Sequence, residues 1–221
     1  MSPLRALILD YGDVLCQPQL PECIRRMAEV ASVPVPTFTD AYWAYRDPYH
    51  VDWTAERYWR AVLEHARSPL GEGARREAFP MLSSLDATSW TAYRESTWNI
   101  AARFKDGGGR TAMLSNGVPE VMARVRQERS LERCFDVVVV SCEVGCAKPD
   151  PAIYQLTLRR LQVEPQAALF VDDRTENLDA ARAIGLQTFH FTGESEAALR
   201  ERLASRGTNG IPLKPPPPAR R

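Results

Sequence analysis

Short apolar runs occur at the start of the chain and repeatedly in its second half. The first run contains Leu7-Ile8-Leu9 and predicts a fully buried strand from Arg5 to Asp10. Four more strands are predicted at Arg110 to Ser115, Asp136 to Val140, Ala168 to Asp172 and Leu186 to Phe191. Helical spacing of apolar residues separates them at 118–130, 150–163 and 175–184. This alternation predicts an α/β fold with a doubly wound, mostly parallel sheet.

Between the first two predicted strands the pattern is helical throughout. Apolar and aromatic residues fall at helical spacing in segments 20–31, 54–67 and 88–104. Strand-like alternation does not interrupt them, which favours one helical insertion. We therefore interpret residues 16–104 as a helical domain inserted into an α/β core made of residues 1–15 and 105–205.

Several residues mark the expected helix ends. Thr54 is a predicted N-cap, although Arg57 at the third helical position means that a full capping box is absent. Asp150 is a second predicted N-cap, and Pro151 suits a first helical position because its missing N–H costs nothing there. Gly185 suits the left-handed position after a helix.

The C-terminal segment has a different composition. Residues 206–221 include Gly207, Gly210 and the run Pro215-Pro216-Pro217-Pro218. This composition predicts a disordered or polyproline tail, with a proline-rich ligand for a partner domain as the alternative.

Charge and cysteine content narrow the classes of partner and compartment. Lys plus Arg equals Asp plus Glu at 28 each, so the net charge attracts neither nucleic acid nor an anionic membrane. The five cysteines are scattered and do not form a zinc-ligand pattern, which favours free thiols in a reducing compartment. A strand begins within a few residues of Met1, and no apolar run reaches membrane length. We expect a cytoplasmic protein without a signal peptide, and its oligomeric state stays open.

Reactive side chains cluster at the predicted strand ends. Asp10 ends the first strand, and open α/β sheets place their reactive groups at that edge. Downstream come Ser115-Asn116-Gly117, then Lys148 between Ala147 and Pro149, and then Asp172-Asp173. An aspartate can attack phosphorus to form an aspartyl-phosphate, while a hydroxyl, backbone N–H groups and an ammonium bind the phosphate. Ser115 and Asp173 have simpler alternative roles as helix caps.

The carboxylate pair points to a metal ion. Asp172 and Asp173 are adjacent at the end of an apolar strand, where they repel one another unless a cation or hydrogen-bond donors compensate. Mg²⁺ accepts a few protein oxygens and keeps water, which leaves room for a phosphate. Asn177, four residues after Asp173, is a candidate hydrogen-bond donor to Asp173 or to its loop.

The order Asp10, Ser115, Lys148, Asp172-Asp173 resembles the four motifs of the haloacid dehalogenase-like (HAD) hydrolase superfamily over residues 4–193. The resemblance implies a Rossmann-like core, and it makes the helical insertion similar to a C1 cap. It implies that Asp10 is the nucleophile and that Ser115, Asn116, Gly117 and Lys148 bind phosphate. It also implies that Asp10, the Gly12 carbonyl, Asp172 and the supporting Asp173 hold Mg²⁺. The expected function is hydrolysis of a small phosphorylated metabolite through an aspartyl-phosphate.

Gly12 departs from the pattern of HAD phosphatases, which usually carry a second Asp two residues after the nucleophile as general acid/base. Glycine keeps the carbonyl that the metal site needs, but the leaving group loses its usual proton donor. Some related phosphatases also have glycine here. Asp13 is the nearest possible substitute, although a shift of one residue redirects the side chain. A positive φ angle is an alternative reason for glycine.

Two alternative functions remain at this stage. Leu114-Ser115-Asn116-Gly117 also resembles the second motif of 2-haloacid dehalogenases, in which Asp10 would attack carbon without a metal. The pair Asp172-Asp173 argues against this alternative, because two negative charges repel an incoming carboxylate. A binding protein that kept the fold and lost catalysis is the other alternative.

Substrate choice is expected to reside in the cap and in the turn after the first strand. Gln17 and Gln19 are candidate hydrogen-bond donors. Tyr45, Trp53 and Trp59 are candidate pocket residues, with packing inside the cap as the alternative role for each.

Overall fold

The computed structural model describes residues 3–205, so the predicted tail at 206–221 lies outside the described residues. One sheet of five parallel strands has the order β3-β2-β1-β4-β5. The strands are β1 (Ala6–Leu9), β2 (Arg110–Ser115), β3 (Val137–Val140), β4 (Ala168–Asp172) and β5 (Gln187–His190). Each lies within one residue of its predicted bounds, which confirms the predicted α/β class.

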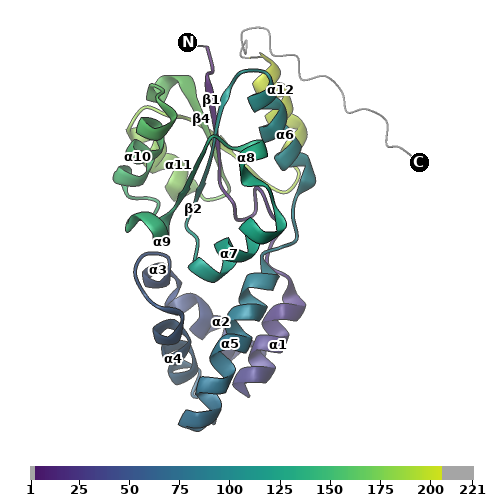
Figure 1. The fold of residues 1–221 in the computed structure, drawn as a ribbon, viewed down its shortest axis with the longest axis vertical. Helices are drawn as coiled ribbons and strands as arrows, with labels where there is room; N and C mark the ends of the chain where they lie inside the picture. The colour runs from purple at the N-terminus through teal and green to yellow at the C-terminus, as the bar shows by residue number, and fades with distance from the viewer. Residues whose placement is uncertain (1–2, 206–221) are drawn as a thin grey trace, which may run out of the picture.

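Helices cover both faces of the sheet (Figure 1). One face carries α10 (Pro151–Leu161) and α11 (Thr175–Ala183). The other carries α6 (Glu95–Asp106), α7 (Pro119–Glu128), α8 (Leu131–Cys134) and α12 (Glu196–Ser205). The short α9 (Ser141–Val144) follows β3, and the 3₁₀ turn η1 (Pro165–Ala167) precedes β4. Because side chains alternate across a strand, Ala6 and Ile8 of β1 belong to one core cluster and Leu7 and Leu9 to the other.

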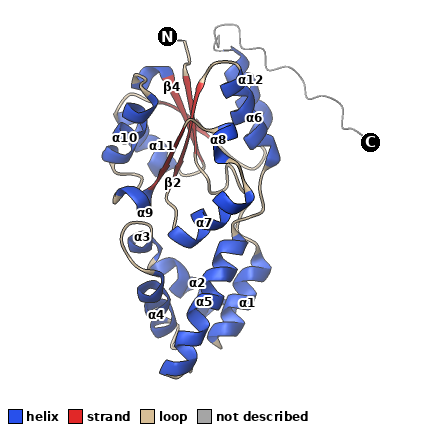
Figure 2. Cartoon of the chain, viewed as in Figure 1, coloured by secondary structure: helices blue, strands red, loops and turns tan. Residues whose placement is uncertain are grey.

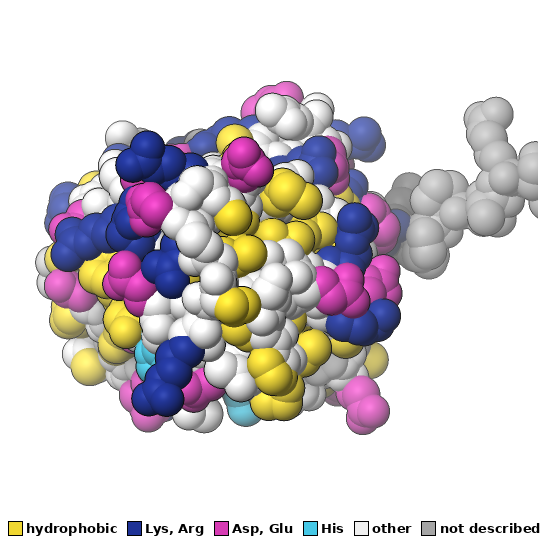
Figure 3. Space-filling view, turned by 90° about the horizontal axis from the view of Figure 1, so that it is seen from below, with side chains coloured by type: hydrophobic (Ala, Val, Ile, Leu, Met, Phe, Trp, Pro, Cys, Tyr) yellow, Lys and Arg dark blue, Asp and Glu magenta, His cyan; other side chains and the backbone are white. Residues whose placement is uncertain are grey.

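A second body of helices lies beyond the carboxyl ends of the strands. It consists of α1 (Pro21–Ala31), α2 (Val35–Ala44), α3 (Arg46–Tyr49), α4 (Ala55–His65) and α5 (Glu72–Ser89). Figure 2 shows strands in the upper body only and helices in this lower one, which we call the cap. Seen from the cap end, basic and acidic side chains are interspersed around small apolar patches (Figure 3), so neither sign of charge dominates that face.

The helix predicted at 88–104 begins later than expected. Residues 88–89 end α5, and α6 starts at Glu95 because Tyr93 forms an antiparallel bridge with Cys16. α6 packs against β2, α8 and α12. A division at residue 104 stays a prediction, but these contacts favour counting α6 with the sheet.

The predicted helix-end residues act as expected. The Thr54 side chain accepts a hydrogen bond from the Arg57 N–H, and Asp150 accepts one from the Ala152 N–H. Gly185 has a φ of +92° after α11. Within residues 3–205, no helix combines the length and apolar character needed to cross a bilayer.

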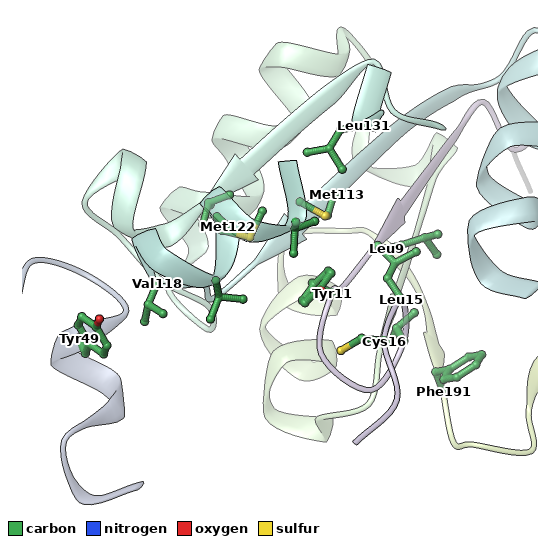
Figure 4. Packing of buried hydrophobic residues seen from close by; sticks show 14 of the residues in the cluster. Leu9, Tyr11, Leu15, Cys16, Tyr49, Met113, Val118, Met122, Leu131 and Phe191 are labelled. Carbon is green, nitrogen blue, oxygen red and sulfur yellow. The ribbon is translucent and has the colours of Figure 1, made fainter. Parts of the chain in front are cut away.

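Packing also connects the cap with the core. Figure 4 shows Leu9 and Met113 beside the strands, Tyr11 in the following loop, and Tyr49 of the cap facing Val118. The Tyr49 hydroxyl donates a 2.6 Å hydrogen bond to Glu120 of α7. The edge of the sheet that carries Asp10 therefore lies against the cap.

Candidate active site

Parallel pairing brings the predicted reactive residues to one edge of the sheet. The Asp10 N–H bonds to the Val171 carbonyl, which continues the β1–β4 pairing to the strand ends. Ser115 ends β2 beside it and is buried. Ser115 does not cap α7, because that helix begins at Pro119 after Val118. The Ser115 hydroxyl is thus available to the pocket that it lines.

Lys148 lies between two carboxylates. Its Nζ is 2.7 Å from Asp10 Oδ1 and 2.7 Å from Asp172 Oδ2. Burial lowers the pKa of Lys148, but the attraction of the two carboxylates outweighs burial and raises the pKa above its usual value. Lys148 is therefore a fixed cation at neutral pH.

Asn116 fixes the position of Lys148. Its side-chain oxygen accepts a hydrogen bond from the Lys148 N–H, and its amide nitrogen donates one to the Lys148 carbonyl, both at 2.8 Å. This two-point pair commits the Asn116 side chain to positioning rather than to phosphate binding. The Gly117 N–H donates to Ser141 Oγ at 3.1 Å, which conflicts with its predicted role as a phosphate donor. A Cβ at Gly117 would lie 3.0 Å from Val140, so close packing explains the glycine.

Asp172 is completely buried, and both of its carboxylate oxygens accept hydrogen bonds. Oδ1 accepts hydrogen bonds from the Arg174 N–H at 2.9 Å and from Asn177 at 3.0 Å. Oδ2 accepts from Lys148 and from Asn177. Asn177 thus bonds to Asp172, whereas the expected partner was Asp173 or its loop. Asp173 does not cap α11, whose N-cap is Arg174.

Three carboxylates share the site with one ammonium. Asp10, Asp172 and Asp173 each offer an oxygen, and these oxygens lie within 4.8 Å of one another. Burial raises the pKa of Asp10 to about 8 against the attraction of Lys148, and burial with the repulsion of Asp172 raises the pKa of Asp173 to about 6. The charged forms of these crowded carboxylates are disfavoured without a cation, and this together with the all-oxygen donor set fits a hard divalent cation.

Gly12 and Asp13 follow in the loop after β1 and line the same pocket. The φ angle of Gly12 is not positive; Asp13 has the positive one, at +52°. Conformational strain thus does not explain the glycine. The Gly12 carbonyl accepts a hydrogen bond from the Val14 N–H, and a carbonyl has a second lone pair for a cation. Burial raises the pKa of Asp13, and its Oδ1 has no hydrogen-bond partner.

The cap supplies the other side of the pocket. Its residues there are Trp43, Arg46, His50 and, in the linker after α5, Trp90. The sequence pattern alone did not indicate that these residues belong to the site. Positions 43, 46 and 50 follow helical spacing, which could have identified a common face. The aromatic residues predicted instead pack within the cap: Tyr45 stacks on Trp53, and Trp59 is fully buried. Gln19 bonds to Tyr42 and Ser89 rather than facing the pocket.

The geometry agrees with a comparison of sequences. The sequence model of the haloacid dehalogenase-like hydrolases matches residues 4–185. The chain belongs to this family. The hydrolase is 28% identical to the phosphorylated carbohydrates phosphatase of Thermotoga maritima, over 85% of this chain and 84% of that protein. It is 32% identical to (S)-2-haloacid dehalogenase 1 of a Pseudomonas strain, over 44% of this chain and 43% of that protein.

Other relatives are much longer proteins. The hydrolase is 37% identical to pig bifunctional epoxide hydrolase 2 over 46% of this chain, but the match spans 19% of that protein. Among solved structures, a HAD family enzyme from Bacteroides thetaiotaomicron in a magnesium complex has a TM-score of 0.73, covering 91% of this chain and all of that one at 15% identity. At that identity the likeness shows the fold alone.

Proposed function

We propose that the hydrolase is a Mg²⁺-dependent phosphatase that cleaves small phosphomonoesters through an aspartyl-phosphate on Asp10. The observation that carries this proposal is the cluster of Asp10, Asp172 and Asp173 around the fixed Lys148. A dehalogenase acts on an anionic substrate without a cation, and such a cluster would repel its substrate. The phosphatase relative of similar length supports the same function.

The chain's own residues account for binding and attack. Lys148 and the Tyr11 N–H hold Asp10 Oδ1, which leaves Oδ2 to attack phosphorus. Ser115 and Lys148 bind phosphate oxygens. The bond from Asp10 to phosphorus forms as the ester P–O bond breaks, and the leaving oxygen departs and takes a proton from water to give the alcohol. Water then attacks phosphorus, which releases phosphate and restores the carboxylate. Mg²⁺ bound by Asp10, Asp172, Asp173 and the Gly12 carbonyl would stabilise the charge that develops on the phosphate oxygens.

Dehalogenation is the second candidate function, because 2-haloacid dehalogenases are also among the relatives. Phosphate release from a panel of small phosphomonoesters, and halide release from 2-chloropropionate, should each be measured with Mg²⁺ and with excess chelator. Phosphate release only with Mg²⁺ supports the phosphatase. Halide release that persists in chelator supports the dehalogenase. If neither phosphate nor halide is released, a non-catalytic binding protein is favoured.

A further inference from the structure

The indole ring of Trp90 lies beside Gly12. A Cβ added to Gly12 would be 3.9 Å from Trp90 Cζ3, an ordinary van der Waals contact. Hydrogen bonds hold both the backbone and the indole ring of Trp90 in place. The Tyr11 hydroxyl donates to the Trp90 carbonyl, while Trp90 Nε1 donates to Asp86 at 3.3 Å and to Tyr42 at 3.4 Å. An aromatic surface therefore lies next to Gly12, the position at which HAD phosphatases usually carry their second Asp.

Trp43 extends this surface. Its ring meets that of Trp90 edge to face, with centroids 6.4 Å apart and an interplanar angle of 89°. Trp43 is 49% exposed, unusual for so large an apolar side chain, and it lines the pocket. Val118, Val121 and Met122 at the start of α7 line the same pocket. Apolar side chains thus come from both the cap and the core.

The cations that line the pocket on its cap side and in the loop before α11 already have acidic partners. Arg46 pairs with Asp86 at 2.8 Å inside the cap, and Arg174 pairs with Glu176. Burial and the nearby cations lower the pKa of His50, so this side chain is neutral. A second anionic group on the substrate would find no unpaired cation among these three residues.

In-line displacement directs the leaving group away from Asp10. With phosphate held by Ser115 and Lys148, that direction leads toward the cap. We propose that Trp43 and Trp90 form a leaving-group subsite that selects aromatic phosphomonoesters. This inference rests on the proposed phosphatase function and adds the class of substrate to it. Aromatic groups gain from edge-to-face contact as well as from burial of apolar area.

Benzyl phosphate and propyl phosphate separate ring recognition from leaving-group chemistry, because both release a primary alcohol. The Mg²⁺-loaded protein should show a kcat/KM for the benzyl ester at least about tenfold above that for the propyl ester. Trp43→Leu should reduce this ratio by about tenfold, and circular dichroism with a thermal melt checks that the variant is folded. Trp53→Leu is the matched control, since Trp53 stacks on Tyr45 away from the pocket, and it should keep the wild-type ratio.

Calorimetry with benzylphosphonate and propylphosphonate, which are not hydrolysed, tests the subsite independently of turnover. Tighter binding of the benzyl compound, weakened by Trp43→Leu, supports the inference. Equal kcat/KM for the two esters, or a ratio that Trp43→Leu does not change, would overturn it while the phosphatase function stands. A higher kcat/KM for glucose 1-phosphate than for benzyl phosphate would also overturn it. Absence of turnover for every ester refutes the phosphatase function, and the phosphonate measurements then still decide the ring preference.

Discussion

At the scale of single residues, the site consists of charges that depend on one another. Lys148 contacts both Asp10 and Asp172, and Asn116 holds the backbone of Lys148 in place. Removing one partner from such a buried set leaves the other charges uncompensated. For each substitution at the site, the stability of the fold must therefore be measured as well as the rate of turnover.

Asp10→Asn should abolish turnover and leave the fold intact. The amide is nearly isosteric with the carboxylate, but it is a poor nucleophile and a weaker metal ligand. Phosphate release under saturating Mg²⁺, together with circular dichroism, checks this prediction. A variant free of wild-type protein that kept more than about a tenth of the activity would remove Asp10 from the nucleophile role.

Gly12→Asp should selectively accelerate esters with poor leaving groups. A phenolate leaves without a proton, whereas an alkoxide needs one, and a general acid contributes about 10²–10⁴-fold. Wild-type protein should therefore hydrolyse phenyl phosphate much faster than propyl phosphate. In the variant the ratio of these two rates should be smaller. Gly12→Ala is the matched control, because a Cβ fits beside Trp90 and the φ angle permits it. Equal wild-type rates for the two esters would show that another group, with Asp13 nearest, already supplies the proton.

Some of these residues could be identified from sequence and others could not. Asp10, Ser115 and Asp172 directly end apolar strands, so their position at the active edge follows from the pattern. The positions of Trp43 and Trp90 in the pocket do not follow from it, because an aromatic residue among helical segments gives the same pattern whether it faces a pocket or a core. Likewise, the bonds that commit Asn116 and Gly117 to the scaffold depend on loops brought together only by folding.

At the scale of elements, the strands were easier to predict than the cap helices. Each strand is a short buried run between clear turns. By contrast, α5 contains Pro80 and Gly73, which argue against a helix, yet it continues for 18 residues from Glu72 to Ser89. Its buried face also includes the charged Asp86, which weakens the apolar periodicity. Tertiary contacts with α1, α4 and α7 stabilise α5 beyond its local propensity.

The buried pair Arg46–Asp86 joins α3 to α5 and allows a stability test. Asp86→Ala should destabilise the protein by about 3–5 kcal/mol, because it leaves the Arg46 charge buried and unpaired. The double variant Arg46→Met/Asp86→Leu should lose much less, since both charges are gone. Urea unfolding of the single variants Arg46→Met and Asp86→Leu and of the double variant measures the coupling. Additive losses would mean that the two charges do not stabilise each other.

At the scale of the whole molecule, the site joins segments that are far apart in sequence. Asp10 follows β1 while Asp172 ends β4, and Tyr49 of the cap bonds to Glu120 of α7. The parallel order explains why strand ends meet at one edge, and this part could be foreseen. The placement of the cap over that edge depends on contacts between the cap and the α/β core, which cannot be predicted from a local sequence pattern.

Magnesium should stabilise the whole fold, because a cation held by Asp10 and Asp172 would join the ends of β1 and β4. Thermal melting of the wild-type protein should shift upward with Mg²⁺ concentration, as expected for a ligand that binds only the folded state. Asp172→Ala should lose most of this shift and need about 10–100-fold more Mg²⁺ for activity. Asp179→Ala, on the exposed side of α11, is the matched control. Full phosphatase activity in excess chelator would refute the role of the metal.

The bridge between Cys16 and Tyr93 has a consequence for how such a protein can arise. The Gln17 N–H bonds to the Ala92 carbonyl and the Arg94 N–H bonds to the Leu15 carbonyl, so the chain leaves and re-enters the core at neighbouring points. Segments whose ends lie side by side are the ones that domains accept as insertions. A recombination event that replaced residues 18–91 would leave the sheet, Asp10 and Lys148 unaltered. The chain thus has the architecture of an α/β core whose helical cap can be exchanged as one block.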